Sequence, residues 1–194
     1  MLNLLRPTDP SWVEAARADL PGLLSDHAHC EIKAAQSALS LVARFGAEHP
    51  EIIDPLSALA REETAHFREV QEHLEDRGGN LGFPRVDEYV RKLREAAHRE
   101  RGHADPFLDR LLISALIEAR SCERFKLLAE GIDDPRLEPF YAGLMVAEAR
   151  HYRLFSELGE RIFGAAVSRP RLARLAELEA EIADQLPLGP TVHG

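Results

Sequence analysis

The residues of this chain best suited to chemistry form two sets of acids and histidines with nearly the same spacing. In each set a single glutamate is followed, 32 or 30 residues later, by a Glu-x-x-His pair. Residues three apart lie on one face of a helix, so each pair can offer a carboxylate and an imidazole to the same point. The residues are Glu31, Glu63 and His66 in the first set and Glu118, Glu148 and His151 in the second.

The donor types of these two sets predict a centre of two metal ions. Four helices would supply four carboxylates and two imidazoles, which is the ligand inventory of di-iron and di-manganese bundles. Four carboxylates neutralise two divalent ions, and hard oxygen donors with imidazole suit iron or manganese better than metals that prefer thiolates. A buried acid without a cation is costly, so acids that recur on apolar helix faces favour a bound cation.

Spacing alone does not separate these sets from the rest of the chain, because Glu-x-x-His occurs four times. The two pairs of the predicted centre share helix faces with leucine, phenylalanine and tyrosine. The other two, Glu95-x-x-His98 and Glu100-x-x-His103, lie in a strongly charged stretch and predict a solvated surface.

A second acid, Glu123, competes with Glu118 for the place in the predicted centre. If the following turn lies near Asp133, Glu118 and Glu148 are each 15 residues from it, whereas Glu123 is only 10 residues before it. At about 1.5 Å of rise per residue, Glu123 would lie roughly 7 Å off level. The sequence therefore favours Glu118.

Other polar residues near the predicted ligands are interpreted as supporting or surface residues. His27 and His29 precede Glu31, and for both a role behind the ligands or on the surface is favoured over ligation. Acids that could orient the ligating histidines are Glu62, Glu69 and Asp54.

Apolar residues recur at helical spacing along nearly the whole chain, which predicts an all-α fold. A long connection over 81–103, with a helix of its own, fits the crossover of a four-helix bundle. We further expect a short helix opened by Asp9-Pro10-Ser11, an extra C-terminal helix that begins after Ser168-Arg169-Pro170 and reaches about Gln185, and a loose end from Pro187. The four long helices are expected over about 23–45, 52–77, 105–130 and 136–163.

Length and composition indicate one globular domain over residues 1–194. The chain is 45% hydrophobic, shows no signal-peptide pattern at its start, and has no apolar run long enough to span a bilayer. We therefore expect a cytoplasmic protein without a membrane partner. Cys30 and Cys122 lie inside helical patterns, which predicts reduced cysteines rather than a disulfide.

Five segments carry a more specific pattern than the spacing of the acids. They are Leu4-Leu-Arg-Pro-Thr-Asp-Pro-Ser-Trp12, Ala28-His-Cys-Glu-Ile-Lys-Ala-Ala-Gln36, Arg61-Glu-Glu-Thr-Ala-His-Phe67, Ile117-Glu-Ala-Arg-Ser-Cys-Glu-Arg-Phe125 and Glu148-Ala-Arg-His-Tyr152. Together they resemble the MiaE-type tRNA hydroxylase family, over about Leu4 to Ile182. The last stretch, residues 183–194, departs from the ending expected for that family.

The resemblance implies a ferritin-like non-haem di-iron monooxygenase. Its substrate would be 2-methylthio-N6-isopentenyladenosine in the anticodon loop of tRNA, hydroxylated on the isopentenyl group. It further implies two iron ions, O2 as co-substrate and an electron-donating reductase system. Carried over by motif, the ligands are Glu31, Glu63, His66, Glu118, Glu148 and His151.

The charge distribution gives weak independent support for an RNA substrate. A net charge of -9 opposes general binding of polyanions. The basic residues are uneven, however: Arg161–Arg174 contains four arginines and no acid, and Arg85–Arg101 contains six basic residues and four acids. A basic rim on an acidic body would admit one tRNA loop, although ordinary solvated helix faces explain the pattern equally well. The candidates for phosphate contact are Arg91, Lys92, Arg94, Arg169, Arg171 and Arg174.

The alternative function is an iron-handling or peroxide-reducing protein of the ferritin or rubrerythrin type, which would use the same ligands. The chain has no Cys-x-x-Cys module of the kind that rubrerythrins carry, and its crossover connection is longer and more basic than a storage shell needs. These features favour the hydroxylase. The oligomeric state stays open.

Overall fold

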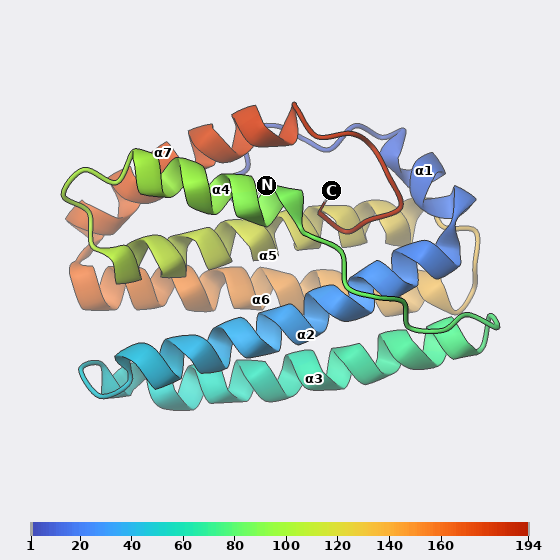
Figure 1. The fold of residues 1–194 in the computed structure, drawn as a ribbon, viewed down its shortest axis with the longest axis horizontal. Coiled ribbons are helices and arrows are strands. Elements are labelled where there is room, and N and C mark those ends of the chain that lie inside the picture. The colour runs from blue at the N-terminus through green and yellow to red at the C-terminus, as the bar shows by residue number, and fades with distance from the viewer. Residues whose placement is uncertain (1, 194) are drawn as a thin grey trace. The chain divides into compact units, whose positions relative to one another are not determined.

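The computed structural model describes residues 2–193, and the regular structure in this range is entirely helical, which confirms the predicted fold class. None of the helices in this range combines the length and the apolar character needed to cross a membrane. The helices are α1 Trp12–Ala18, α2 Leu20–Phe45, the 3₁₀ helix η1 Pro50–Ile52, α3 Ile53–Glu75, α4 Glu88–Arg99, α5 Pro106–Gly131, α6 Leu137–Phe163 and α7 Ala165–Ala183 (Figure 1).

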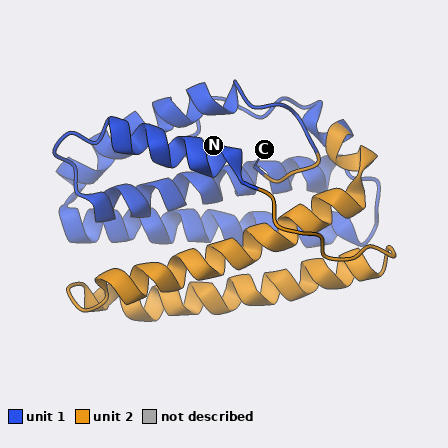
Figure 2. Ribbon diagram, in the orientation of Figure 1, with its two compact units in different colours: residues 1–14, 86–189, 193–194 blue, residues 15–85, 190–192 orange. Residues whose placement is uncertain are grey.

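The chain divides into two compact units, which Figure 2 shows in different colours. One unit is built on α2 and α3 and covers residues 15–85 and 190–192. The other contains α4 to α7, together with the segment that precedes residue 15 and with His193. Each unit holds one of the two Glu…Glu-x-x-His sets.

The α2–α3 unit is an antiparallel helix pair (Figure 1). Asp19 caps the start of α2: its side chain accepts a hydrogen bond from the N–H of Gly22 and so satisfies a backbone donor of the first turn. Helix α3 ends before Gly78, which has φ of 71°, and the N–H of Gly79 donates to the carbonyl of Leu74. The glycines therefore end the helix as the sequence predicts.

The unit that contains α4 to α7 is organised around α5, in which 17 of 26 residues are buried. Helix α6 packs along α5 as an antiparallel partner, and α4 and α7 also contact it (Figure 1). Leucine and alanine side chains of α4, α5 and α7 form one apolar cluster with Tyr89. Because so much of α5 is covered, several of its polar residues are buried as well.

Helix α7 begins earlier than the sequence predicted. The expected start lay after residues 168–170, but a one-residue turn at Gly164, with φ of 83°, lets α7 begin at Ala165. The hydroxyl of Ser168 donates to the carbonyl of Gly159 at 2.8 Å and fastens α7 to α6. Pro170 therefore lies inside the helix, where its ring nitrogen cannot make the backbone bond of that position.

The expectation of a loose C-terminal end is also wrong for the part of the tail that the structure describes. His193 is buried and stacks on Tyr89 with ring centroids 5.5 Å apart. Its Nε2 lies 2.9 Å from the hydroxyl of Ser121, and its Nδ1 lies 3.2 Å from Asp87. In the other unit, the N–H of Val192 donates to Asp26 at 2.8 Å. A Pro- and Gly-rich composition does not reveal such specific polar contacts.

Candidate metal centre

Helices α2 and α3 bring together the three predicted ligands of the first set. One ligand atom from each of Glu31, Glu63 and His66 lies within 4.8 Å of the others. The Nδ1 of His66 is 3.1 Å from an oxygen of Glu63 and 3.6 Å from an oxygen of Glu31. All three side chains are buried, so two acids and an imidazole share a site poor in water.

The two acids change the protonation of the histidine between them. Burial lowers the pKa of His66, but hydrogen bonds and charge from Glu31 and Glu63 outweigh that effect and raise the pKa to about 10. In the absence of any other cation the imidazole is therefore protonated near neutral pH. The two carboxylates stabilise a positive charge at this point. The same electrostatic effect would stabilise a bound metal ion.

His27 supports the first acid directly. It is fully buried, and its Nε2 lies 2.7 Å from Oε1 of Glu31, one helical turn further along α2. A carboxylate oxygen only accepts, so the imidazole donates and Nε2 carries the proton. This contact agrees with the expected role behind the ligands. His29 lies elsewhere, with its Nε2 2.8 Å from the carbonyl oxygen of Gly82.

Helices α5 and α6 bring together the second set. One ligand atom from each of Glu118, Glu148 and His151 lies within 4.8 Å of the others, and all three residues are buried. The Nδ1 of His151 lies 3.5 Å from Oε2 of Glu148. That oxygen accepts no hydrogen bond from any of residues 2–193. A buried carboxylate oxygen in this state fits coordination to a cation, since leaving it unsatisfied is costly.

Glu123 is engaged in a different contact. Its carboxylate accepts hydrogen bonds from the N–H and the hydroxyl of Thr8 and from Arg120. The structure thus brings Glu118, and not Glu123, next to Glu148 and His151, as the comparison of helix levels favours. The assignment of Glu118 as a metal ligand stays a prediction.

Some of the remaining sequence candidates lie beside a cluster and others lie at the surface. Glu62, one of the three suggested supporting acids, has an oxygen 4.0 Å from Nε2 of His66. The two charged Glu-x-x-His pairs lie at the surface: both histidines are exposed, Glu95 pairs with Arg91, and Glu100 pairs with Arg174. Neither of the two cysteines, both within residues 2–193, is in a disulfide, and the thiol of Cys122 donates to the carbonyl of Met145.

A buried ionic network in the α4–α7 unit was not expected from the sequence. Arg120 is 1% exposed and donates from Nε and Nη2 to one oxygen of Glu179 on α7. The hydroxyl of Tyr89 on α4 donates to the same oxygen at 3.0 Å. Burial raises the pKa of Glu179, although Arg120 and Tyr89 oppose that shift. The Arg-Ser-Cys-Glu-Arg motif could have predicted this network, because charged side chains on an otherwise apolar helix need partners of opposite charge when they are buried.

Ion pairs divide the residues suggested for phosphate contact into two groups. Arg171 donates to both oxygens of the buried Asp109 and to the carbonyls of Glu100 and Ala97. Arg169 pairs with both oxygens of Glu160. These two arginines connect helices of the α4–α7 unit, so they are less available to an RNA than side chains without an acidic partner.

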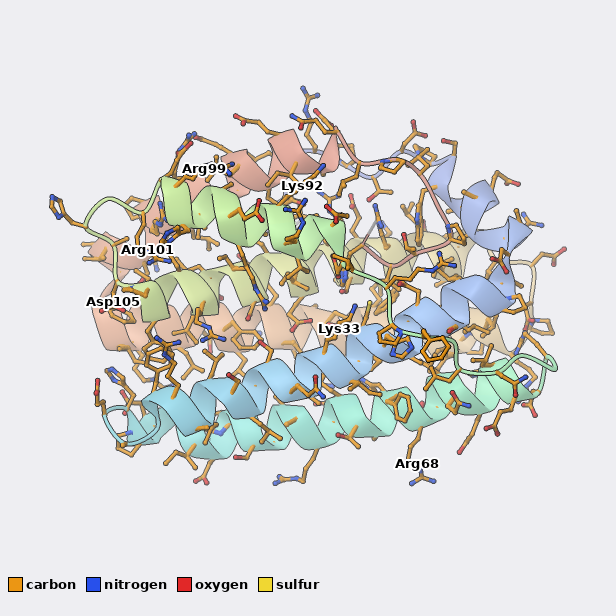
Figure 3. All side chains as sticks on the ribbon, in the orientation of Figure 1. Lys33, Arg68, Lys92, Arg99, Arg101 and Asp105 are labelled. Carbon is orange, nitrogen blue, oxygen red and sulfur yellow. The ribbon has the colours of Figure 1, made fainter. Side chains whose placement is uncertain are left out.

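The α4 residues of the same prediction are more available. Arg91 pairs with Glu88 and Glu95 on its own helix. Lys92 and Arg94 form no ion pair with any of residues 2–193, and Arg94 is exposed. Figure 3 shows Lys92 and Arg99 on α4, with Arg101 in the segment that follows. Of these basic residues, Arg91 and Arg101 already have acidic partners, whereas Lys92 and Arg94 keep their charge available.

The helix pairs and their buried acid-histidine clusters define a ferritin-like protein with carboxylate and imidazole donors suited to iron. A solved structure with the same fold is described as protein 43 with aldehyde deformylating oxygenase activity, from Synechococcus. It is 37% identical, has a TM-score of 0.88, and the match covers 98% of this chain and 95% of that chain. The fold class predicted from the sequence is thereby confirmed.

The chain belongs to the MiaE family: the family model described as tRNA-(MS[2]IO[6]A)-hydroxylase (MiaE) matches residues 1–194. Two relatives are named tRNA 2-(methylsulfanyl)-N(6)-isopentenyladenosine(37) hydroxylase. The one from Pseudomonas putida is 41% identical, with 89% of this chain and 83% of the relative covered. The one from Salmonella typhimurium is 31% identical, with 94% and 84% covered. The resemblance stated from the sequence is thus confirmed.

Proposed function

We propose that this chain is an enzyme that hydroxylates the isopentenyl group of 2-methylthio-N6-isopentenyladenosine in tRNA. Membership of the MiaE family over the whole chain is the observation that carries the proposal. The two relatives named for this reaction support it, because the matches extend over most of both chains. The two buried clusters supply donors of the kind that such a reaction requires.

The proposed cofactor is a pair of iron ions held by both clusters, within one functional domain made of residues 1–194. Glu31, Glu63 and His66 would supply one half of the ligands, and the α5–α6 cluster of three the other half. Two divalent ions would balance four carboxylates, so the pair would carry no net charge in a buried site. When bound, the iron pair would supply, with O2, the oxidising power that no amino-acid side chain has.

The stoichiometry of the reaction implies an electron donor. One oxygen atom of O2 enters the new C–O bond, and the other leaves as water after uptake of two electrons and two protons. We therefore propose a reductase system as a partner, in the cytoplasm where tRNA is modified. The chain's own residues would position the iron ions, exclude water and hold the RNA, with the modified adenine extruded from its loop stack.

Six basic residues are proposed to hold the RNA backbone: Arg91, Lys92, Arg94, Arg169, Arg171 and Arg174. Their contacts rank them. Lys92 and Arg94 are the leading members, because neither forms an ion pair within residues 2–193. Arg171 is the least suited, since only 10% of its side chain is exposed and Asp109 occupies its guanidinium.

The deciding experiment incubates the iron-loaded protein with tRNA, a reductant and O2, and then measures the tRNA nucleosides by mass spectrometry. We expect the isopentenyl adenosine to gain one oxygen atom. Glu118→Ala should abolish this product, whereas Glu123→Ala should keep a normal iron content per folded molecule. A wild-type protein with full iron that leaves the nucleoside unchanged would refute the proposal.

A second candidate reaction follows from the solved structure, whose description names aldehyde deformylating oxygenase activity. The same iron-loaded protein can be given a long-chain aldehyde in place of tRNA, and formate can be measured. Formate without hydroxylated nucleoside would favour this reaction. The iron-storage alternative has less support, because the matching family and both relatives are named as hydroxylases.

A further inference from the structure

The segment between α3 and α4 exposes an aromatic ring that the fold does not use. Phe83 is 96% exposed, the highest value among the large exposed hydrophobic residues of the described chain. It lies in residues 81–85, here called the Phe83 segment, which is exposed throughout. A lone exposed leucine is ordinary, but a fully exposed phenylalanine retains a large unsatisfied apolar surface.

Three side chains of α2 hold the backbone of the Phe83 segment in place. The hydroxyl of Ser25 accepts a hydrogen bond from the N–H of Gly82 at 2.9 Å, and Nε2 of His29 donates to the carbonyl of Gly82 at 2.8 Å. Nζ of Lys33 donates to the carbonyl of Arg85 at 3.2 Å. Residues 25, 29 and 33 are one turn apart, so they form a single row along α2.

This arrangement fixes the main chain and leaves the side chains outward. Phe83 precedes Pro84, which disfavours a helical backbone at Phe83 and keeps the chain open there. Hydrogen bonds from α2 go to backbone groups on either side of the ring, and the exposed side chain of Arg85 lies two residues further on. The ring is therefore presented by a held backbone at low entropic cost.

The charges around the ring favour a polyanion. No acid occurs between Asp76 and Asp87, and Arg85 adds a cation next to the ring. Lys33, labelled on α2 in Figure 3, adds a second cation beside the same segment. An aromatic face with neighbouring cations, in a segment that itself contains no acid, suits an unpaired nucleotide, whose base stacks while its phosphate contacts the cations.

We propose that Phe83 is a stacking platform for an unpaired base of the tRNA loop and that Arg85 contacts an adjoining phosphate. This inference rests on the proposed function and names a part of the substrate-binding surface. The row of Ser25, His29 and Lys33 lies about 120–160° around α2 from Glu31 at 100° per residue. Phe83 therefore takes a nucleotide other than the one that is hydroxylated.

The test measures binding of the full-length protein to a synthetic RNA hairpin with an anticodon stem and with a loop that carries 2-methylthio-N6-isopentenyladenosine. Loss of one base-stacking contact weakens binding by about 5- to 150-fold, so Phe83→Ala should show a loss in this range. Phe83→Tyr should keep the affinity, because it retains the aromatic face. Phe83→Leu should bind as weakly as Phe83→Ala, since it keeps apolar bulk but has no aromatic face.

Matched controls come from the same unit. Leu39, which is 52% exposed on α2, gives Leu39→Ala as the control for lost apolar surface. Arg68 extends away from the α2–α3 pair in Figure 3 and gives Arg68→Ala as the control for Arg85→Ala. Arg85→Ala should reduce the slope of log affinity against log salt by about 0.7, the value for one phosphate contact on a single strand. Both controls should match the wild type.

Two results would overturn the inference: either Phe83→Ala or Phe83→Leu could bind the hairpin as tightly as the wild type. If Phe83→Ala binds RNA unchanged and its turnover falls only when a protein electron donor replaces the chemical reductant dithionite, the segment serves that donor instead. Product formation by the wild type is measured on the same RNA. Weak binding by Phe83→Ala without product in the wild type would refute the hydroxylase and leave the stacking site standing.

Discussion

The two helix pairs carry equivalent sets of acids and histidine but hold them by different means. In α2–α3 the first acid is supported by a histidine one turn before it, His27, at 2.7 Å. In α5–α6 the residue one turn before Glu118 is Ser114, and the helix is instead enclosed by α4, α6 and α7. The comparison teaches that one ligand pattern can be positioned by a specific hydrogen bond or by dense packing around its helix.

The largest effect is expected from removing the histidine of either set, and it tests whether the two sets are equivalent as metal ligands. His66→Ala and His151→Ala should each lose at least one iron ion and all hydroxylation, because each removes the only imidazole of its cluster. The measurement is metal analysis of the purified variants together with the nucleoside assay. His98→Ala is the matched control, since His98 also ends a Glu-x-x-His pair but is exposed. Full iron content in either of the first two variants would break the equivalence.

The next largest effect is a loss of stability from a change in the buried ionic network of the α4–α7 unit. Arg120→Met leaves the buried carboxylate of Glu179 without its cation and should lower the free energy of unfolding by about 3–5 kcal/mol. The loss should shrink at acid pH, because the raised pKa of Glu179 lets this carboxyl take up a proton in the folded state.

Chemical denaturation monitored by circular dichroism measures this change. The control is Arg91→Met, whose ion pairs lie at the surface, where solvent screens them, so that their loss should change the stability little. Equal losses in the two variants would show that the buried network contributes no more than a surface pair.

A third prediction sharpens the difference in how the two acids are supported. His27→Ala should weaken iron binding by about 10- to 100-fold, the usual effect of removing a hydrogen-bond partner behind a metal ligand. His27→Gln, which can still donate, should recover part of the loss. Ser114→Ala, at the equivalent place on α5, should stay near wild type. Iron titration with optical detection gives the affinities, and an equal loss in both alanine variants would contradict the comparison.

The smallest effect tests the cover over α5. His193→Ala removes contacts with Ser121, Asp87 and Tyr89 and should lower the free energy of unfolding by about 1 kcal/mol, the worth of one or two net hydrogen bonds. His103→Ala, at an exposed histidine, is the control. Thermal unfolding of both proteins would detect the difference, and identical melting temperatures would show that the tail contributes nothing.

The sequence predicted the elements whose signals are local. Repeated apolar spacing, the Gly78-Gly79 stop and the Asp105-Pro106 start gave four long helices within a few residues of their bounds. The level of Glu118 relative to Glu148 followed from helical rise alone. These features depend on neighbours along the chain, so no knowledge of tertiary contacts was needed.

Features that depend on distant contacts were missed. The tail beyond Pro187 has a composition typical of loops, yet His193 is buried against Tyr89, more than one hundred residues away in the chain. The pairing of Arg171 with Asp109 was not expected either, and it makes this arginine the least suited of the six residues proposed for phosphate contact. A charged residue looks the same in sequence whether its partner is RNA or another helix, and only the fold distinguishes the two.

The contacts of the N-terminal segment have a consequence for synthesis on the ribosome. Arg120 donates to the carbonyl of Arg6, 114 residues earlier, and to Glu179, 59 residues later. The α2–α3 helix pair can form as soon as its own residues have left the ribosome. The unit around α5 cannot be completed until α7 has been synthesised, and until then the N-terminal segment lacks its full set of contacts and stays exposed. Nascent chains halted before α7 should thus protect α2–α3 against protease and leave residues 2–14 open to cleavage.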